Sequence, residues 1–282
     1  MDAIPVYYSP AMVSQTAGSS PSAAKPAPVV ESWRNLGIPL RIIPPTPVAR
    51  DQIAAAHSPD RVDRILAGKA INGFGNASLE VAASLPHTSG AMLSGAREAI
   101  RNRRVAVAPC SGFHHATYAE PQGYCTFNGL MIAAIALHAT SEARKVGILD
   151  FDEHYGNGTD DIIARLKLRF VTHFTAGNQY HQPVHAASFL ERIPEIVGTM
   201  ADCDVILYQA GADPHIDDPL GGWLTDAQLY ERDLLVFQTA ARLGVPIVWN
   251  LAGGYQTPLR KVLDIHDNTM RACAAVYLRP PA

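Results

Sequence analysis

From residue 104 onward, short apolar runs rich in Val and Ile alternate with longer amphipathic segments. The apolar runs have the length of strands, and the segments between them have the length of helices. We predict strands at 104–108, 145–151, 169–174, 204–210 and 246–252. We predict helices at about 127–140, 158–167, 187–200, 226–243 and 258–277. Near-continuous apolar strands separated by helices are typical of a parallel sheet that helices cover on both faces.

The N-terminal part of the chain is less regular. Residues 13–30, VSQTAGSSPSAAKPAPVV, are rich in Ser, Ala and Pro and show neither a helical nor a strand period, so we expect an irregular loop. Such a loop often serves as a lid or a subunit contact, with plain disorder as the alternative. Prolines cluster again at 42–48, and an apolar stripe at about 48–67 predicts a helix. The pattern predicts one α/β domain over residues 1–282, without an internal repeat.

Composition excludes several classes of protein. With 282 residues, of which 48% are apolar, the chain can bury a large core and is too apolar to be disordered. A net charge of −3 argues against a protein that binds nucleic acid through phosphate contacts. No apolar run approaches the length of a membrane span, so we expect no membrane association.

The spacing of the cysteines and the N-terminal residues indicate the cellular compartment of the protein. Cys110, Cys125, Cys203 and Cys273 lie far apart and form no CxxC pair, which argues against zinc-finger and thioredoxin-like sites. The N-terminus, MDAIPVYYSP, has an acid where a signal peptide carries bases and lacks an apolar segment. We therefore expect the cysteines to be reduced and the protein to be cytoplasmic. Oligomeric state cannot be read from these residues, and a homo-oligomer stays open.

Polar and titratable residues follow four of the predicted strands. The segments are SGFHHA at 111–116, DFDEHYGNGTDD at 150–161, GADPHIDDPLGG at 211–222 and AGGY at 252–255. In an open parallel sheet, ligands bind beyond the carboxyl ends of the strands, which lie along one edge. We expect the four segments to converge on a single site.

Two of these segments carry candidate metal ligands. In the D-x-D-x-H run at 150–154, residues two apart share one side of an extended chain. Asp152 and His154 offer an oxygen and a nitrogen, and both suit zinc. Solvated acids and a surface histidine are the alternative. A second acidic group contains Asp213, Asp217 and Asp218. One of these acids would complete a three-ligand zinc site with its fourth position open for water, although turn capping also explains one of them.

The other two segments suit acid–base chemistry. His114 and His115 are adjacent, and two imidazoles with different partners can divide base and electrostatic duties. Tyr255 follows Gly253 and Gly254, which permit close approach of the backbone, and its phenol would donate to a developing oxyanion. A histidine without a chemical role and a tyrosine packed over the sheet end are the plain alternatives.

The four motifs, in this order and with GYCTFN at 123–128 after the histidines, resemble those of the histone deacetylase superfamily. That superfamily includes acetylpolyamine amidohydrolases and bacterial histone deacetylase-like amidohydrolases. The resemblance is firm over about 105–280 and weaker towards VYYSP at 6–10. It implies the single-domain arginase/deacetylase fold, with a mostly parallel sheet and helices on both faces. It also implies zinc-dependent hydrolysis of acetyl-lysine, an acetylpolyamine or another small acylated amine.

The resemblance assigns roles residue by residue. The zinc ligands that it implies are Asp152, His154 and Asp218. The catalytic residues are His114, His115, Tyr255, Asp150 and Asn157. The residues that line the substrate site are Gly123, Tyr124, Gly253 and Gly254. A structural potassium ion would contact Asp150, Asp152, His154 and Thr172.

Three positions depart from the pattern of the superfamily. Tyr155 stands where many members have a second histidine, Asn157 where some have an aspartate, and Gly129 where an aspartate is common. None of them is a metal ligand, so we expect activity, although Asn157 leaves the pKa of His115 open. Two other functions are considered. One is an arginase-type ureohydrolase with a two-metal site, and the other is a non-catalytic module that binds acylated amines.

Overall fold

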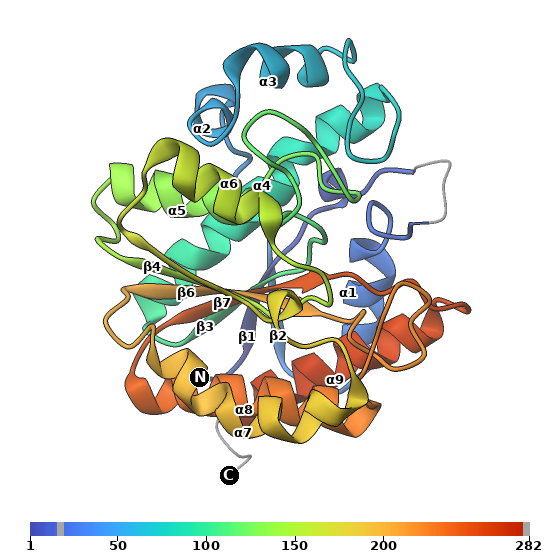
Figure 1. Cartoon of the computed structure of the whole chain (residues 1–282), viewed down its shortest axis with the longest axis vertical. Helices are drawn as coiled ribbons and strands as arrows, with labels where there is room; N and C mark the ends of the chain where they lie inside the picture. Colours follow the sequence, from blue (N-terminus) through green and yellow to red (C-terminus); the bar gives the residue numbers. More distant parts are fainter. Residues whose placement is uncertain (16–19, 279–282) are drawn as a thin grey trace.

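Seven strands form one sheet in the computed structural model, which describes residues 1–15 and 20–278. Their order is β2-β1-β3-β7-β6-β4-β5, and each neighbouring pair is parallel (Figure 1). The strands are β1 Ile4–Tyr7, β2 Leu40–Ile43, β3 Val105–Ala108, β4 Val146–Asp150, β5 Val171–Thr175, β6 Val205–Gly211 and β7 Ile247–Ala252. The predicted α/β class with a parallel central sheet is confirmed.

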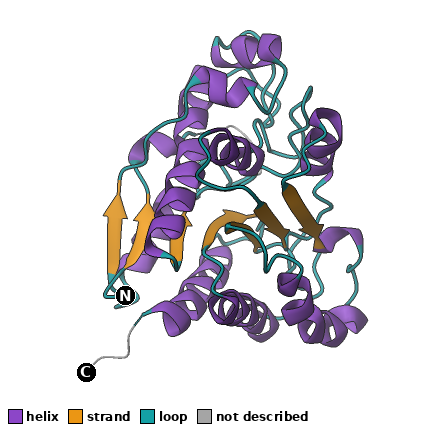
Figure 2. Ribbon diagram, turned by 90° about the vertical axis from the view of Figure 1, so that its left-hand side faces the viewer, coloured by secondary structure: helices purple, strands orange, loops and turns teal. Residues whose placement is uncertain are grey.

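Helices lie in two layers, one on each face of the sheet (Figures 1 and 2). One layer consists of α1 Pro26–Arg34, α7 Ala186–Gly198, α8 Asp226–Leu243 and α9 Arg260–Tyr277. The other consists of α4 Leu79–Asn102, α5 Gly129–Ala139 and α6 Asn157–Leu166, with α2 Arg50–Ala54 and α3 Pro59–Leu66 beyond them. Short 3₁₀ turns are η1 Pro10–Met12, η2 Ala176–Asn178 and η3 Pro183–His185. Each layer buries a core of its own against the sheet, as predicted.

After residue 104, the predicted elements are all present, with ends that differ by one or two residues. The N-terminal part differs more. Helix α1 begins inside the segment 13–30 that was predicted to be irregular, because a proline at the first helical position is well tolerated. Residues 16–19 of that segment lie outside the described residues. The stripe at 48–67 forms two helices, α2 and α3, which are separated just before Pro59. Strands β1 and β2 have four residues each, too few for a period to be visible.

The 24-residue helix α4 was not predicted either. Its buried face is made largely of small residues, which leave no apolar stripe of large side chains. The small residues are needed, because a Cβ at Gly90 would collide with the backbone of Thr46, and one at Gly95 would lie 2.8 Å from Cγ2 of Val248. In the described part of the chain, no helix combines the length and apolar character that crossing a bilayer requires.

His57, between α2 and α3, joins this region to the loops near the site. Its Nδ1 lies 2.9 Å from the carbonyl oxygen of Thr117, and its Nε2 accepts a 2.8 Å hydrogen bond from the Asn128 N–H. Burial lowers the pKa of His57 to about 4, below the usual 6.5. The folded state therefore binds this proton more weakly than the unfolded state.

We expect the contribution of His57 to the free energy of unfolding to be fully present above pH 6.5. As the pH falls towards 4, this contribution should be lost, which lowers the free energy of unfolding by about 3 kcal/mol. His57→Gln keeps an acceptor for Asn128 but does not titrate. Urea unfolding across this pH range should therefore give a shallower loss for the variant than for the wild type. Parallel curves for the two proteins would show that His57 does not carry the effect.

Candidate active site

The loops after β3, β4, β6 and β7 meet at the carboxyl edge of the sheet, as the sequence predicts. His114, after β3, contacts Asp150 at the end of β4, with 2.8 Å between Nδ1 and Oδ2. Asp218, after β6, accepts a 2.8 Å hydrogen bond from the main-chain N–H of Tyr255, after β7. Residues far apart in the sequence therefore form one site.

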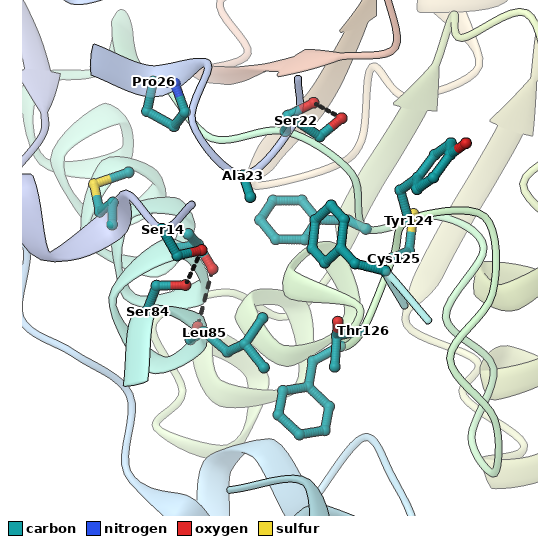
Figure 3. A pocket seen from close by; sticks show the side chains of 15 residues that line it. Ser14, Ser22, Ala23, Pro26, Ser84, Leu85, Tyr124, Cys125 and Thr126 are labelled. Atoms are coloured by element: carbon teal, nitrogen blue, oxygen red, sulfur yellow. Dashed lines mark hydrogen bonds between the residues drawn. The ribbon is translucent and has the colours of Figure 1, made fainter. Parts of the chain in front are cut away.

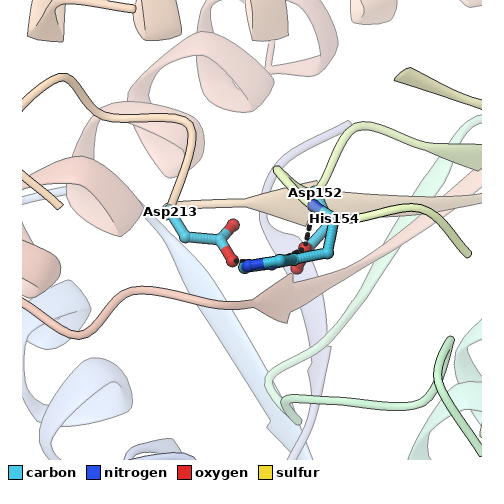
Figure 4. Close-up of side chains that lie close together, drawn as sticks. All are labelled: Asp152, His154 and Asp213. Carbon is cyan, nitrogen blue, oxygen red and sulfur yellow. Dashed lines mark hydrogen bonds and ion pairs between the residues drawn. The ribbon is translucent and has the colours of Figure 1, made fainter. Parts of the chain in front are cut away.

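Asp152, His154 and Asp213 form a group of possible metal ligands, whose ligand atoms all lie within 4.8 Å of one another. The imidazole of His154 lies between the two carboxylates (Figure 4). Its Nδ1 is 3.2 Å from Oδ1 of Asp152 and 3.2 Å from Oδ2 of Asp213. Both aspartates are buried, and two carboxylate oxygens with one imidazole nitrogen are a donor set that suits zinc. The residues present therefore fit a zinc ion.

The group contains Asp213, whereas the resemblance implies Asp218 as the third ligand, and that assignment stays a prediction. Burial and the nearby charge of Asp152 raise the pKa of Asp218, so its carboxylate also lies close to the group. Its Oδ1 accepts a 3.0 Å hydrogen bond from the N–H of Leu220, and its Oδ2 accepts the bond from Tyr255. Asp218 therefore fixes the Tyr255 turn, and both acids stay candidates for the third ligand.

Electrostatics show that this group of acids attracts positive charge. The pKa of His154 is raised to about 11, because Asp152 and Asp213 both accept from its Nδ1. Burial and the charge of Asp152 raise the pKa of Asp213 to about 6. Two carboxylates this close are stabilised by a shared cation, and a metal ion would be such a cation.

Different partners hold the two adjacent histidines. The buried His114 pairs with the carboxylate of Asp150. Nδ1 of His115 lies 2.6 Å from Oδ1 of Asn157, and Nδ2 of Asn157 donates to Gln122 across 3.2 Å. Because the amide oxygen can only accept, Nδ1 of His115 carries the proton and its Nε2 keeps a free lone pair.

The partners give the two imidazoles opposite pKa shifts. Burial lowers the pKa of His114, but the charges of Asp150 and Asp152 outweigh it and raise the pKa to about 9. Burial and the neighbouring charge of His114 lower the pKa of His115 below its usual value. The pKa of His115, which the sequence left open because of Asn157, is therefore lowered. A neutral His115 lies beside a positively charged His114.

Three glycines bring the backbone close to other groups of the site. Gly253 and Gly254 both have positive φ, and a Cβ at Gly253 would collide with the carboxylate of Asp213. Gly123 also has positive φ, and its Cβ would collide with the ring of His115. These positions accept only glycine, because a side chain would be both strained and blocked. That Gly123, Gly253 and Gly254 line the substrate site stays a prediction.

A buried lysine next to the site, Lys25, was not predicted from the sequence. Lys25 has no exposed surface, and its Nζ donates to the carbonyl oxygen of Gly253. Burial lowers its pKa to about 8, against the opposing charges of Asp213, Asp152 and Asp218. A lysine in a Ser- and Ala-rich segment gives no local signal. Only burial next to the turn that carries Tyr255 reveals its position.

Thr172 does not reach the predicted potassium ligands. It pairs with Gly147 along β4, whereas Asp150 pairs with Thr175 at the other end of β5. The hydroxyl of Thr175 accepts a 3.1 Å hydrogen bond from the N–H of Gly156, close to Asp150. Thr172 thus lies three residues along β5 from the residue that pairs with Asp150, and the potassium ion itself stays a prediction.

A cavity of about 490 Å³ opens beside the metal group. The residues that line it are His115, Glu153, His154, Tyr155, Asn157, Gly177, His181 and Leu220. Tyr155 and Asn157, two of the departures from the superfamily pattern, are therefore on its wall. Burial and the charge of Asp213 raise the pKa of Glu153, another wall residue, to about 8.

A smaller pocket of about 30 Å³ is lined in part by Tyr124 and Cys125 (Figure 3). Hydroxyl groups of Ser14, Ser22 and Ser84 are among its lining. The ring of Tyr124 also lies 5.7 Å from that of Tyr255, measured between centroids. Tyr124 therefore lines this pocket and lies near the ring of Tyr255, and its place at the substrate site stays a prediction.

The chain is similar in sequence to a known domain family and to several known proteins. The histone deacetylase domain matches residues 22–174 and 169–271. An uncharacterised protein of Picosynechococcus is 27% identical over 183 residues, which cover 59% of this chain and 61% of that protein. Histone deacetylase 6 of Caenorhabditis elegans is 26% identical, covering 64% of this chain and 21% of that protein. Acetylpolyamine amidohydrolase 1 of Pseudomonas aeruginosa is 28% identical, covering 50% and 48%. The chain thus spans less than two thirds of these relatives.

Two solved structures have the same fold. The HD domain of HDA15 superposes with a TM-score of 0.76 at 16% identity, covering 100% of this chain and 90% of that one. An acetylpolyamine aminohydrolase from Burkholderia pseudomallei gives a TM-score of 0.71 at 19% identity, covering 97% and 99%. At these identities the likeness concerns the fold alone. The domain match spans most of the chain, and it establishes that the chain belongs to the histone deacetylase domain family.

Proposed function

We propose that this protein is a zinc-dependent deacetylase, which hydrolyses the amide of an acylated amine to a carboxylate and a free amine. The observation that carries the proposal is the group of Asp152, His154 and Asp213. His154 shares the wall of one cavity with His115, the second of the paired histidines. A zinc ion held there would supply a Lewis acid for the carbonyl and would lower the pKa of water. Membership of the histone deacetylase domain family supports this reaction.

His115 is the general base in this proposal. It lines the cavity, and its Nδ1–H is bound by Asn157, so its Nε2 is left to take a proton from the attacking water. His114 lies alongside, with 4.0 Å between the two ring centroids, and pairs with Asp150. Its positive charge stabilises the negative charge that develops on the carbonyl oxygen.

Tyr255 provides the second stabilising group. Burial and the charges of Asp213 and Asp152 raise the pKa of its phenol well above the usual value, so the hydroxyl keeps its proton and can donate. After the tetrahedral stage, the proton held by His115 passes to the leaving nitrogen, and the amine departs uncharged before it takes a proton from solvent.

Two other functions were considered, and the same observations bear on them. An arginase-type ureohydrolase needs two metal ions, whereas the described residues gather one group of three or more metal-ligand side chains. A non-catalytic module that binds acylated amines has no use for a neutral imidazole and a buried phenol beside a metal site. A hydrolase with one metal ion therefore accounts for more of the site residues than either alternative function does.

Removal of zinc tests the proposal. We expect pure protein to hold about one zinc per chain, measured by elemental analysis, and to release acetate from acetyl-lysine peptides or acetylated polyamines. Dialysis against a chelator should abolish turnover, and one equivalent of zinc should restore it. Two manganese ions per chain with arginine hydrolysis would favour the ureohydrolase. Full turnover after complete removal of metal would contradict the proposal.

A further inference from the structure

A buried arginine lies behind the strands that lead to the proposed metal ligands. Arg232, in helix α8, is fully buried. Its Nη1 donates to two main-chain carbonyl oxygens, that of Phe151 across 3.2 Å and that of Gly211 across 2.7 Å. Phe151 directly precedes Asp152, and Gly211 lies two residues before Asp213. One nitrogen of this side chain thus bridges the two segments that carry acidic ligands.

The bridge lies where the pairing between β4 and β6 ends. Asp150 and Gln209 are the last residues in register along these two strands, and the N–H of Phe151 still donates to the carbonyl oxygen of Gln209 across 3.1 Å. The two chains remain close beyond this pair, because a Cβ at Gly211 would lie 2.5 Å from Cα of Asp152. Buried carbonyl oxygens at such a place need a donor, and the two N–H bonds of Nη1 supply one to each.

Other buried side chains fix the orientation of this guanidinium. Nε of Arg232 donates to Oδ1 of Asp233 across 2.9 Å, and both side chains are buried. The hydroxyl of Tyr208 donates to the same carboxylate oxygen, and that of Thr269 donates to Oδ2 across 2.6 Å. Tyr208 lies on β6 and Thr269 on α9, so the carboxylate is held from the sheet and from the neighbouring helix. Nη1 is therefore aimed at the strand ends.

Stability alone does not account for a charged pair at this place. Removing two charges from water costs about as much as their attraction returns, so well-packed apolar side chains would stabilise a core equally well. Apolar side chains could not, however, satisfy two buried carbonyl oxygens and hold the ends of two strands at a fixed separation. Loss of a group that orients metal ligands from behind lowers metal affinity by about 10- to 100-fold. The contacts of Arg232 are those of such a group.

We propose that Arg232 is a positioning residue, which sets the separation of the segments that carry Asp152 and Asp213 and thereby the affinity and geometry of the metal site. The inference rests on the proposed zinc-dependent function and assigns a role to a residue outside the four loop segments. Arg232 is not itself a ligand, and it acts through the main-chain carbonyl groups at the strand ends. Because Gly211 precedes both Asp213 and Asp218, the bridge positions either acid as the third ligand.

The test measures metal affinity and folding separately. Arg232→Met keeps an unbranched side chain but removes every donor. We expect its metal-free form to unfold cooperatively in urea, and its Kd for zinc to rise about 10- to 100-fold in competition with a chromogenic chelator. With cobalt in place of zinc, its visible absorption bands should shift, because these bands report coordination geometry.

Thr269→Val is the matched control, because it removes a donor from the carboxylate that holds Arg232 but leaves the bridge in place. It should lower the urea midpoint, keep the Kd for zinc within about threefold of wild type and leave the cobalt bands unchanged. An equal loss of zinc affinity in Thr269→Val and Arg232→Met would assign the effect to stability and overturn the inference.

A second variant covers the case in which Arg232→Met does not fold. Arg232→Lys keeps the charge opposite Asp233, but its single nitrogen cannot reproduce a fork that bonds this acid and two carbonyl groups, so we expect zinc affinity to fall about tenfold. Wild-type zinc affinity and cobalt bands in whichever variant folds would overturn the inference. If the wild type binds zinc but hydrolyses no acylated amine, the proposed function fails, whereas weaker zinc binding in the Arg232 variant still supports the positioning role.

Discussion

Replacing Asp213 by asparagine should remove most of the zinc from this protein and abolish deacetylation. Asp213 is one of three residues whose ligand atoms lie within 4.8 Å of one another, and its Oδ2 lies 3.2 Å from Nδ1 of His154. An amide oxygen is neutral and a poorer zinc ligand than a carboxylate. We expect zinc affinity to fall by about 10²-fold or more, since even loss of a group that only supports a ligand costs about 10- to 100-fold.

Asp218→Asn is the matched comparison, because the sequence alone favoured Asp218 as the ligand. Its two oxygens accept from the main-chain N–H groups of Leu220 and Tyr255, and asparagine keeps one good acceptor for them. We expect this variant to keep one zinc per chain and to lose about tenfold or less in kcat, through a looser Tyr255 turn. Zinc content by elemental analysis decides between the two acids without relying on activity. Normal zinc in Asp213→Asn with loss of zinc in Asp218→Asn would restore the sequence-based assignment.

The choice between these acids shows where sequence reasoning reaches its limit. The GADPHIDDPLGG segment holds three aspartates within six residues, and any of them fits a ligand pattern. Strand β6 ends at Gly211, which packs directly against the backbone of Asp152, so Asp213 is delivered to the site. The chain then turns, and Asp218 accepts hydrogen bonds from the main-chain N–H groups of Leu220 and Tyr255. Which acid meets the metal depends on where the strand ends, and apolar patterns locate strand ends poorly.

The sheet and the convergence of its loops were predictable because their signals are strong. Strands β4, β6 and β7 are buried along their whole length and therefore read as continuous apolar runs. Parallel strands bring their carboxyl ends to one edge, so residues such as His114, Asp152 and Tyr255 could be assigned to a single site without coordinates.

Other parts of the fold carry no such signal. Helix α4 is covered on one face by backbone and small residues, so close packing replaces the large apolar side chains that mark an amphipathic helix. Lys25 lies in a segment whose composition predicts a loop, and its burial next to Gly253 results from contacts across more than two hundred residues of sequence. Such long-range contacts determine the site and are invisible to local periodicity.

The second large effect is expected at the catalytic phenol. Tyr255→Phe should lower kcat by about 10²- to 10³-fold, because the hydroxyl donates to a negative charge that exists only during the reaction. The KM and the zinc content should change little, since Asp218 binds the main-chain N–H of Tyr255 and the ring still packs against Tyr124. Loss of the hydroxyl thus separates transition-state stabilisation from metal binding and from substrate binding.

Steady-state kinetics with an acetylated substrate, alongside elemental analysis of zinc, provide the measurement for Tyr255→Phe. Tyr230→Phe is the matched control, because it removes the same hydroxyl from helix α8, away from the loops that form the site. A drop in zinc content in Tyr255→Phe would assign the loss of rate to a disturbed metal site. Near-normal turnover with normal zinc would show that the charged His114 and the metal suffice to stabilise the oxyanion, and that the Tyr255 hydroxyl has no catalytic role.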